Sequence, residues 1–150
     1  MQKISHLESH LGYWLRLVSN YVSHDFNKKL KERGFAIAEW VLLRLIYESQ
    51  EMTPGNLAEV TGMTRGAVTK VIDKLLEKDL VLRIESLKDR RFQHLRLTRK
   101  GQHLVPSLAK LADENEHVYF SFLSKEEQKQ IIHMLKRVAE RHQLGKIPID

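Results

Sequence analysis

Residues 61–100 constrain the fold of this chain more than any other segment, because a helix-turn signal is followed directly by a basic hairpin pattern. Thr61-Gly62 ends a short helical pattern, and Thr64 is placed to cap an amphipathic basic helix over about residues 65–78. A strand pattern, a charged turn and a second strand pattern follow, over Leu80–Glu85, Ser86–Arg91 and Phe92–Leu97. This order predicts a winged helix-turn-helix.

The positive charge of the chain is concentrated in the same segment. Residues 64–100 contain 11 Lys and Arg against 5 Asp and Glu, whereas the whole chain contains 25 against 19. The rest of the chain is therefore balanced, and the net charge of +6 lies within this one stretch. A concentrated positive face is what binding to a polyanion such as double-stranded DNA requires.

The composition excludes several other classes of protein. The absence of cysteine removes disulfide frameworks, thiolate metal sites and cysteine nucleophiles. No apolar run approaches the roughly 20 residues needed to cross a bilayer, and the N-terminal residues lack the pattern of a signal peptide. The chain also contains no glycine-rich phosphate loop, no His-Glu-x-x-His and no serine in a nucleophile elbow. We therefore expect a cytoplasmic protein with no membrane contact, no cofactor and no enzymatic activity.

Hydrophobic periodicity predicts a mainly α fold with a small β-hairpin wing. The chain is read as a single domain, 1–150, in which helices over about 4–31 and 99–142 flank a winged helix-turn-helix over about 37–98. The outer helices comprise spans 4–31, 99–122 and 125–142. The helix over about 37–48 is apolar around most of its circumference and is expected to be central and buried. The long apolar stripes of the outer helices favour a homodimer interface.

Hydroxyl residues mark the expected helix starts. Thr53 before Pro54, Thr64 and Thr98 are placed as N-caps, and Ser124 with Glu127 has the spacing of a capping box. Pro106 lies within the fifth helix and is expected to kink it or to displace its start. The C-terminal residues GKIPID are expected to be loose.

The helix over about 65–78 has the features of a recognition helix. Its core-facing side chains are predicted to be Val68, Val71, Ile72 and Leu75, and the opposite face carries groups suited to DNA. Gly66 lies near the centre of that outward face, where the lack of a side chain lets the backbone approach the groove closely. The alternative is that a glycine near a helix start costs little and has no function. The predicted DNA contacts of this helix are Thr64, Arg65, Gly66, Thr69, Lys70 and Lys74.

The turn between the two strand patterns supplies a second set of contacts. Arg90 and Arg91 project from the expected hairpin tip, where an arginine can enter the minor groove. Asp89 is placed to pair with an arginine two residues on and to stiffen the tip before DNA is bound. A solvated charge run is the common fate of such residues, but the preceding helix favours the functional interpretation.

These motifs resemble those of the MarR family of bacterial transcription regulators. Asp89-Arg90-Arg91 with Leu95-x-Leu97-Thr98 and Gly101 is similar to the family's wing signature, and the helix-turn-helix resemblance runs from Leu57 to Leu75. The resemblance covers nearly the whole chain. It implies a homodimer that binds a pseudo-palindromic operator, with Arg91 in the minor groove and Asp89 bracing it. It also implies a repressor released by a small phenolic or other aromatic ligand.

The same resemblance suggests where such a ligand would lie, among the first, second and fifth helices. The aromatic candidates are Tyr13, Trp14, Trp40 and Tyr47, and Arg16 is a candidate cation for a carboxylate, such as that of an aromatic acid. For each aromatic residue taken singly, ordinary core packing is the more common use. For Arg16, a surface position is the more common one.

Two alternative interpretations remain open on the sequence. A winged helix can act as a protein-interaction module without binding DNA, although such a module would expose apolar residues on its outward face. A metal-responsive regulator would use histidines, and His6 and His10 have the spacing of one helix face. No compact second pair accompanies them, since His103 and His117 are too far apart along one helix, so no metal site is predicted.

Overall fold

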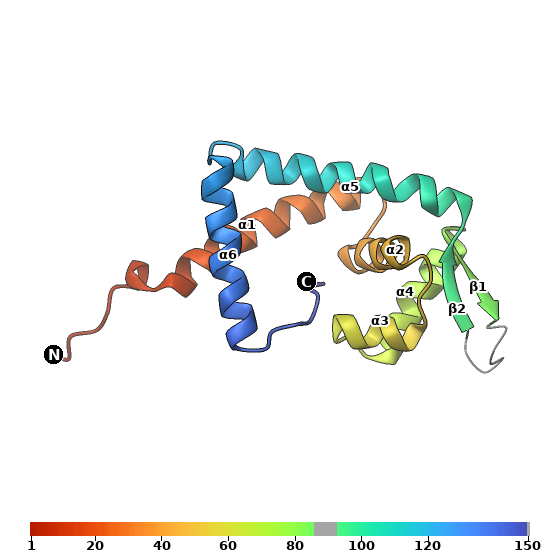
Figure 1. The fold of residues 1–150 in the computed structure, drawn as a ribbon, viewed down its shortest axis with the longest axis horizontal. Coiled ribbons are helices and arrows are strands. Elements are labelled where there is room, and N and C mark those ends of the chain that lie inside the picture. The colour runs from red at the N-terminus through yellow and green to blue at the C-terminus, as the bar shows by residue number, and fades with distance from the viewer. Residues whose placement is uncertain (86–92, 150) are drawn as a thin grey trace.

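The computed structural model describes residues 1–85 and 93–149, and there it shows the mainly helical fold with one antiparallel hairpin that was predicted. Helices α1 and α5 run together along the molecule, and α6 descends from the end of α5, across the direction of both, in the view of Figure 1. Helices α2, α3 and α4 and the hairpin form a lobe beneath the first half of α5. The bounds are a short 3₁₀ helix Leu7–Ser9, α1 Leu11–Glu32, α2 Ile37–Ser49, α3 Pro54–Thr61, α4 Arg65–Glu77, β1 Val81–Glu85, β2 Gln93–Leu97, α5 Arg99–Phe120 and α6 Lys125–Arg141.

The lobe has one continuous apolar core centred on α2. Leu42, Leu43 and Ile46 of α2 are completely buried, which confirms the prediction that this helix is central. Burial of one such side chain stabilises the fold by about 1.5–3 kcal/mol, so this core determines how α4 and the hairpin sit. The residues that meet α2 from α4, β2 and α5 include Val68, Ile72, Leu75, Leu95, Val105 and Leu108.

The four predicted hydroxyl caps are all formed. The side chains of Thr53, Thr64, Thr98 and Ser124 each accept a hydrogen bond from the main-chain amide three residues on, at 3.0, 3.1, 3.0 and 3.1 Å. The Glu127 carboxylate accepts in return from the Ser124 amide at 2.8 Å, which completes the capping box. Each cap stabilises its helix by about 1 kcal/mol.

Strand β2 of the hairpin is paired on both of its edges. Strands β1 and β2 pair from Val81 with Leu97 to Glu85 with Gln93. Met52, in the loop after α2, exchanges two main-chain hydrogen bonds with Leu95 of β2, at 3.1 and 2.8 Å. The loop between α2 and α3 therefore acts as a one-residue third strand that ties the wing to the helix-turn-helix.

Helix α5 begins tightly against the start of β1. A Cβ atom on the buried Gly101 would lie 2.2 Å from the main-chain oxygen of Leu80, a distance that no real side chain tolerates. Farther along α5, the side chain of Asn115 is buried and donates to the Val22 carbonyl at 3.0 Å, while its oxygen accepts from Lys29 at 3.2 Å. These contacts fix α5 to the lobe at one end and to α1 at the other.

The structure corrects three expectations about the outer segments. The first helix begins at Leu11 rather than near residue 4, because the Ser9 hydroxyl donates to the His6 carbonyl at 2.6 Å and competes with helical bonding. The fifth helix starts at Arg99 despite Pro106 and ends at Phe120 rather than 122. The C-terminal residues are not loose, because Ile147 and Ile149 pack against the lobe.

Candidate nucleic-acid interface and effector pocket

Helix α4 presents one face to the core and the opposite face to solvent. Val68, Ile72 and Leu75 are buried and Val71 is half-buried, as predicted from the sequence. The outward face carries only polar, charged and glycine residues, so it is suited to a groove of DNA rather than to an apolar partner surface. All six predicted contacts are exposed on this helix or at its cap: Thr64, Arg65, Gly66, Thr69, Lys70 and Lys74.

The two threonines differ in what they can offer a nucleic acid. The Thr64 oxygen accepts from the Ala67 amide at 3.1 Å, so its hydroxyl proton is available to donate to a phosphate. The Thr69 hydroxyl donates to the Arg65 carbonyl at 2.9 Å, which leaves its methyl group and an acceptor lone pair facing outward. Thr64 is therefore suited to a backbone contact and Thr69 to a base edge.

Gly66 has open space around it. A Cβ atom built there would meet nothing within 4 Å. Within the protein nothing requires a glycine at this position, in contrast to Gly101. Gly66 is therefore either tolerated because a glycine near a helix start costs little, or required by a ligand outside the chain.

The outward face carries more positive than negative charge: Arg65, Lys70 and Lys74 against Asp73 and Glu77. Asp73 lies 3.5 Å from Arg83 of β1, which offsets its charge and links α4 to the wing. Arg65, Lys70 and Lys74 form no ion pair with any residue of 1–85 or 93–149, so their charges remain available for phosphates.

A second ion pair holds the base of the wing. Arg96 of β2 donates to one Glu51 oxygen at 3.0 and 2.8 Å, which ties the hairpin to the loop before α3. The predicted tip residues Asp89, Arg90 and Arg91 lie outside the described residues.

The predicted ligand residues are not brought together within one chain. Tyr13 and Trp14 pack edge to face at 5.1 Å near the exposed start of α1, and Arg16 is exposed one turn on. Trp40 fills part of the core against Phe26, with ring centroids 6.2 Å apart, in agreement with the core-packing alternative. Tyr47, in contrast, faces a pocket.

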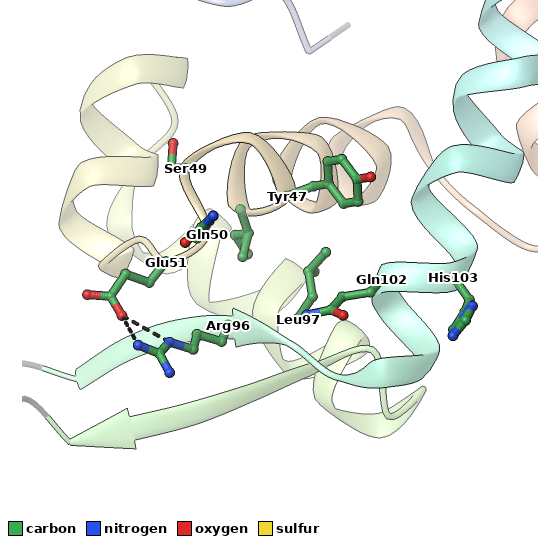
Figure 2. Close-up of a pocket in the computed structure, with 9 residues that line it drawn as sticks. Tyr47, Ser49, Gln50, Glu51, Arg96, Leu97, Gln102 and His103 are labelled. Atoms are coloured by element: carbon green, nitrogen blue, oxygen red, sulfur yellow. Dashed lines mark hydrogen bonds and ion pairs between the residues drawn. The ribbon is translucent and has the colours of Figure 1, made fainter.

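That pocket lies between the end of α2, β2 and the first turns of α5 (Figure 2). It has a volume of ≈ 1090 Å³ and a largely polar lining. Figure 2 shows Tyr47 above the pocket, Gln102 and His103 on α5, and the paired Arg96 and Glu51 at the far side. Arg96 supplies a cation to this pocket, although it is paired with Glu51, and Tyr47 supplies a ring on the opposite side.

Sequence reasoning identified Tyr47 but missed the polar residues around it. Arg96 lies between the inward-facing Leu95 and Leu97, so strand alternation did place its side chain outward. No local pattern relates Arg96 to His103 or Glu51, because the pocket arises from the packing of β2 against α2 and α5. Glu51 also lies 3.5 Å from the His94 ring.

The described residues give no support to the metal alternative. His6 and His10 do not share a helix face, because each lies in extended backbone at the start of a helix. No group of three or more potential ligands occurs among residues 1–85 and 93–149. Within these same ranges, no helix is both long enough and apolar enough to cross a membrane.

The chain is similar to known proteins both in sequence and in fold. The sequence model of the MarR family matches residues 35–92. The chain is 31% identical over 121 residues to the HTH-type transcriptional regulator MhqR of Bacillus subtilis, covering 78% of this chain and 81% of that protein.

Two solved structures share the fold. A mutant form of MarR of Escherichia coli, complexed with operator DNA, superposes with a TM-score of 0.74 at 24% identity, over 85% of this chain and 92% of that one. BpsR of Bordetella bronchiseptica, whose DNA binding is regulated by 6-hydroxynicotinic acid, gives a TM-score of 0.77 at 20% identity, over 91% and 98%. Both support the winged helix-turn-helix assignment.

Proposed function

Because the chain belongs to the MarR family of transcriptional regulators, we propose that it is a repressor released by a small aromatic or phenolic ligand. In this proposal a homodimer binds a pseudo-palindromic operator through α4 and the wing. The outer helices form the dimer, and residues 37–98 form the DNA-reading lobe. The relatives are transcriptional regulators rather than enzymes, in agreement with the missing catalytic motifs.

The apolar surface of the outer helices supports the homodimer. Helix α6 has no buried residue, although Ile131, Ile132, Met134, Leu135 and Val138 lie along it. The start of α1 and the end of α5 lie at the same end of the molecule as α6 and also expose large apolar side chains (Figure 1). Within these helices they are Leu11, Trp14, Leu15, Val18 and Val118, and next to them in the chain lie the equally exposed Leu7 and Phe122. An isolated chain would leave this surface in water at a cost of about 25 cal/mol per Å², which a second copy would remove.

A two-fold axis through that surface would present two copies of α4 to one side of a duplex. In helix-turn-helix dimers the paired recognition helices lie about 34–36 Å apart, one turn of DNA. Thr64, Arg65, Gly66, Thr69, Lys70 and Lys74 would then meet the major groove, and Arg90 and Arg91 the minor groove. The observation that carries this proposal is the outward face of α4, which is cationic and has no apolar side chain.

The pocket of Figure 2 supports the ligand part of the proposal. It touches α2, the wing and α5, which are the elements whose relative positions set the spacing of the two lobes. An aromatic acid held there by Arg96 and Tyr47 would favour one spacing over others. BpsR, whose regulator is a heteroaromatic acid, has the same fold. Tyr13, Trp14 and Arg16 would contribute only if a partner's α1 reaches this pocket.

Selection of bound genomic fragments, followed by a salt series on one selected duplex, tests the proposal. We expect affinity to fall steeply as salt rises, and bound duplex to be released by candidate aromatic acids. A flat salt dependence, or no binding to any fragment at low salt, would rule out DNA reading and favour the protein-interaction alternative. Sedimentation of the free protein tests the dimer.

A further inference from the structure

The C-terminal residues of the chain act as a cap on another helix. Helix α3 has eight residues, and the last carbonyls of such a helix have no partner within it. The Gly62 amide donates to the Ala58 carbonyl at 2.9 Å. The next two carbonyls are satisfied from the far end of the chain: Lys146 Nζ donates to the Glu59 carbonyl, and the Ile147 amide donates to the Val60 carbonyl at 3.0 Å.

The segment that supplies these donors is itself anchored. Helix α6 ends in a left-handed turn at Gln143, whose φ is 55°, and the Leu144 amide donates back to the Ala139 carbonyl at 2.8 Å. From there the chain runs from the end of α6 toward the lobe (Figure 1). The methylenes of Lys146 lie over Gly62, with Cγ 3.6 Å from the Cβ position, and Ile147 and Ile149 pack against the core.

The capped end of α3 is the point from which the recognition helix starts. Gly62 has a φ of 72° and leads within two residues to the Thr64 cap of α4. A helix of this length is marginal alone, so the order of its last turn depends on external partners. The cation of Lys146 also lies at the negative end of the α3 dipole, where a positive charge is stabilising.

We propose that residues 143–149 form a C-terminal strap in which Lys146 and Ile147 are positioning residues for DNA reading. They cap α3, hold the turn that begins α4, and connect the position of α6 to that of the recognition helix. A shift of α6 within a dimer would be transmitted directly through the strap to the recognition helix α4, without passing through α5. The effect on affinity rests on the proposed operator binding, whereas the effect on α3 does not.

The test compares the full chain with a form that lacks residues 146–150, and the matched control lacks Asp150 alone. Amide hydrogen exchange is measured on DNA-free protein. We expect exchange across α3 and the turn to α4 to become at least tenfold faster in the truncated form, and the increase to be larger there than in α2, whose core loses only the packing of Ile147 and Ile149. Operator affinity is expected to fall by about three- to thirtyfold, the range that removal of a helix cap gives. Sedimentation is expected to stay the same.

Point variants separate capping from direct contact with DNA. Lys146→Arg should preserve slow exchange and affinity, and Lys146→Met should weaken both in part. The slope of log affinity against log salt should be unchanged in Lys146→Met, because removal of a cap takes away no phosphate contact. A slope reduced by about 0.9 per site would show that Lys146 touches phosphate and would overturn the positioning role.

Two further outcomes would also overturn the strap. Unchanged exchange in α3 after truncation would show that the tail does not order it. Dissociation of the dimer on truncation would assign the tail to the subunit interface instead. If neither the full-length protein nor any variant binds a duplex, the proposed function fails. The exchange result alone then shows whether the strap orders α3.

Discussion

Lys78 and Glu39 form an ion pair of 2.6 Å between the end of α4 and the first turn of α2. The Glu39 side chain is buried, and its second oxygen accepts from the Ala36 amide at 3.2 Å. The same lysine donates to the Gly34 carbonyl at 2.8 Å and lies 4.5 Å from the centre of the Phe35 ring. The recognition helix is therefore held at its C-terminal end by a charge pair set against the turn between α1 and α2.

Removal of the lysine should be costly because it leaves a buried carboxylate without its cation. We expect Lys78→Met to lower the free energy of unfolding by about 1–3 kcal/mol in a denaturant titration. Lys110→Met, at an exposed position on α5, is the control and should change it by less than about 0.5 kcal/mol. Equal stabilities of the two variants would contradict a structural role for the pair.

Gly101→Ala should destabilise the lobe, because the new methyl group would press on the Leu80 carbonyl and force α5 away from β1. The expected decrease in the free energy of unfolding is about 1–3 kcal/mol, as for overpacking in a core. Thermal and denaturant unfolding measure it. An unchanged midpoint would mean that the start of α5 can move without cost.

Gly66→Ala is the matched substitution on the same protein with the opposite expected effect on stability. Since its methyl group meets nothing, helix propensity should raise the stability by up to about 1 kcal/mol. Operator affinity should fall if the backbone of α4 approaches the groove floor. A variant that is more stable and binds as well as the parent would remove any functional reason for this glycine.

Lys70→Ala should weaken operator binding and reduce the slope of log affinity against log salt by about 0.9 for each phosphate that the lysine neutralises. Lys110→Ala makes the same change of charge on an exposed residue outside the reading face and serves as the control. A binding series at several salt concentrations distinguishes the two. Equal slopes of log affinity against log salt for Lys70→Ala and the parent protein would show that Lys70 does not contact a phosphate.

The pair of Arg96 with Glu51 gives a test of the effector pocket. Arg96→Met should abolish release of the operator by aromatic carboxylates while DNA binding persists. Glu51→Gln should have the opposite effect and lower the ligand concentration needed, because the arginine is freed from its competing carboxylate. Titration of a bound duplex with ligand measures both. Equal release by both variants would show that the ligand binds elsewhere.

The Tyr119 hydroxyl donates its one proton to the Asp25 carboxylate, and the Tyr21 carbonyl lies 3.2 Å from the same oxygen as a weaker second acceptor. The hydrogen bond to Asp25 raises the pKa of Tyr119 above its usual 10.0, and desolvation and the Asp25 charge act in the same direction. The bond therefore stabilises the fold fully below pH 10, and this stabilisation disappears as the pH rises through the higher folded pKa. In an ultraviolet titration, Asp25→Asn should bring one tyrosine back toward the ordinary range.

The elements of this fold could be predicted because their signals are local. The caps at Thr64 and Thr98 and the alternation of Leu95 and Leu97 each lie within a few residues of the structure they specify. The outward residues of α4 followed from helical periodicity alone. The first helix was placed too early because the side-chain bond of Ser9 interrupts a hydrophobic pattern that continues through it.

The sequence by itself determined the winged helix-turn-helix and the cationic face of α4, since charge, caps and periodicity act over short distances along the chain. Only the tertiary structure decided which residues those elements pack against, because such contacts join residues that are far apart in sequence. No periodic pattern links the C-terminal tail to the carbonyls of a helix more than eighty residues earlier. The contacts decided in this way are Glu39 with Lys78, Gly101 against Leu80, Arg96 with Glu51 in the pocket that Tyr47 also lines, and Lys146 and Ile147 on α3.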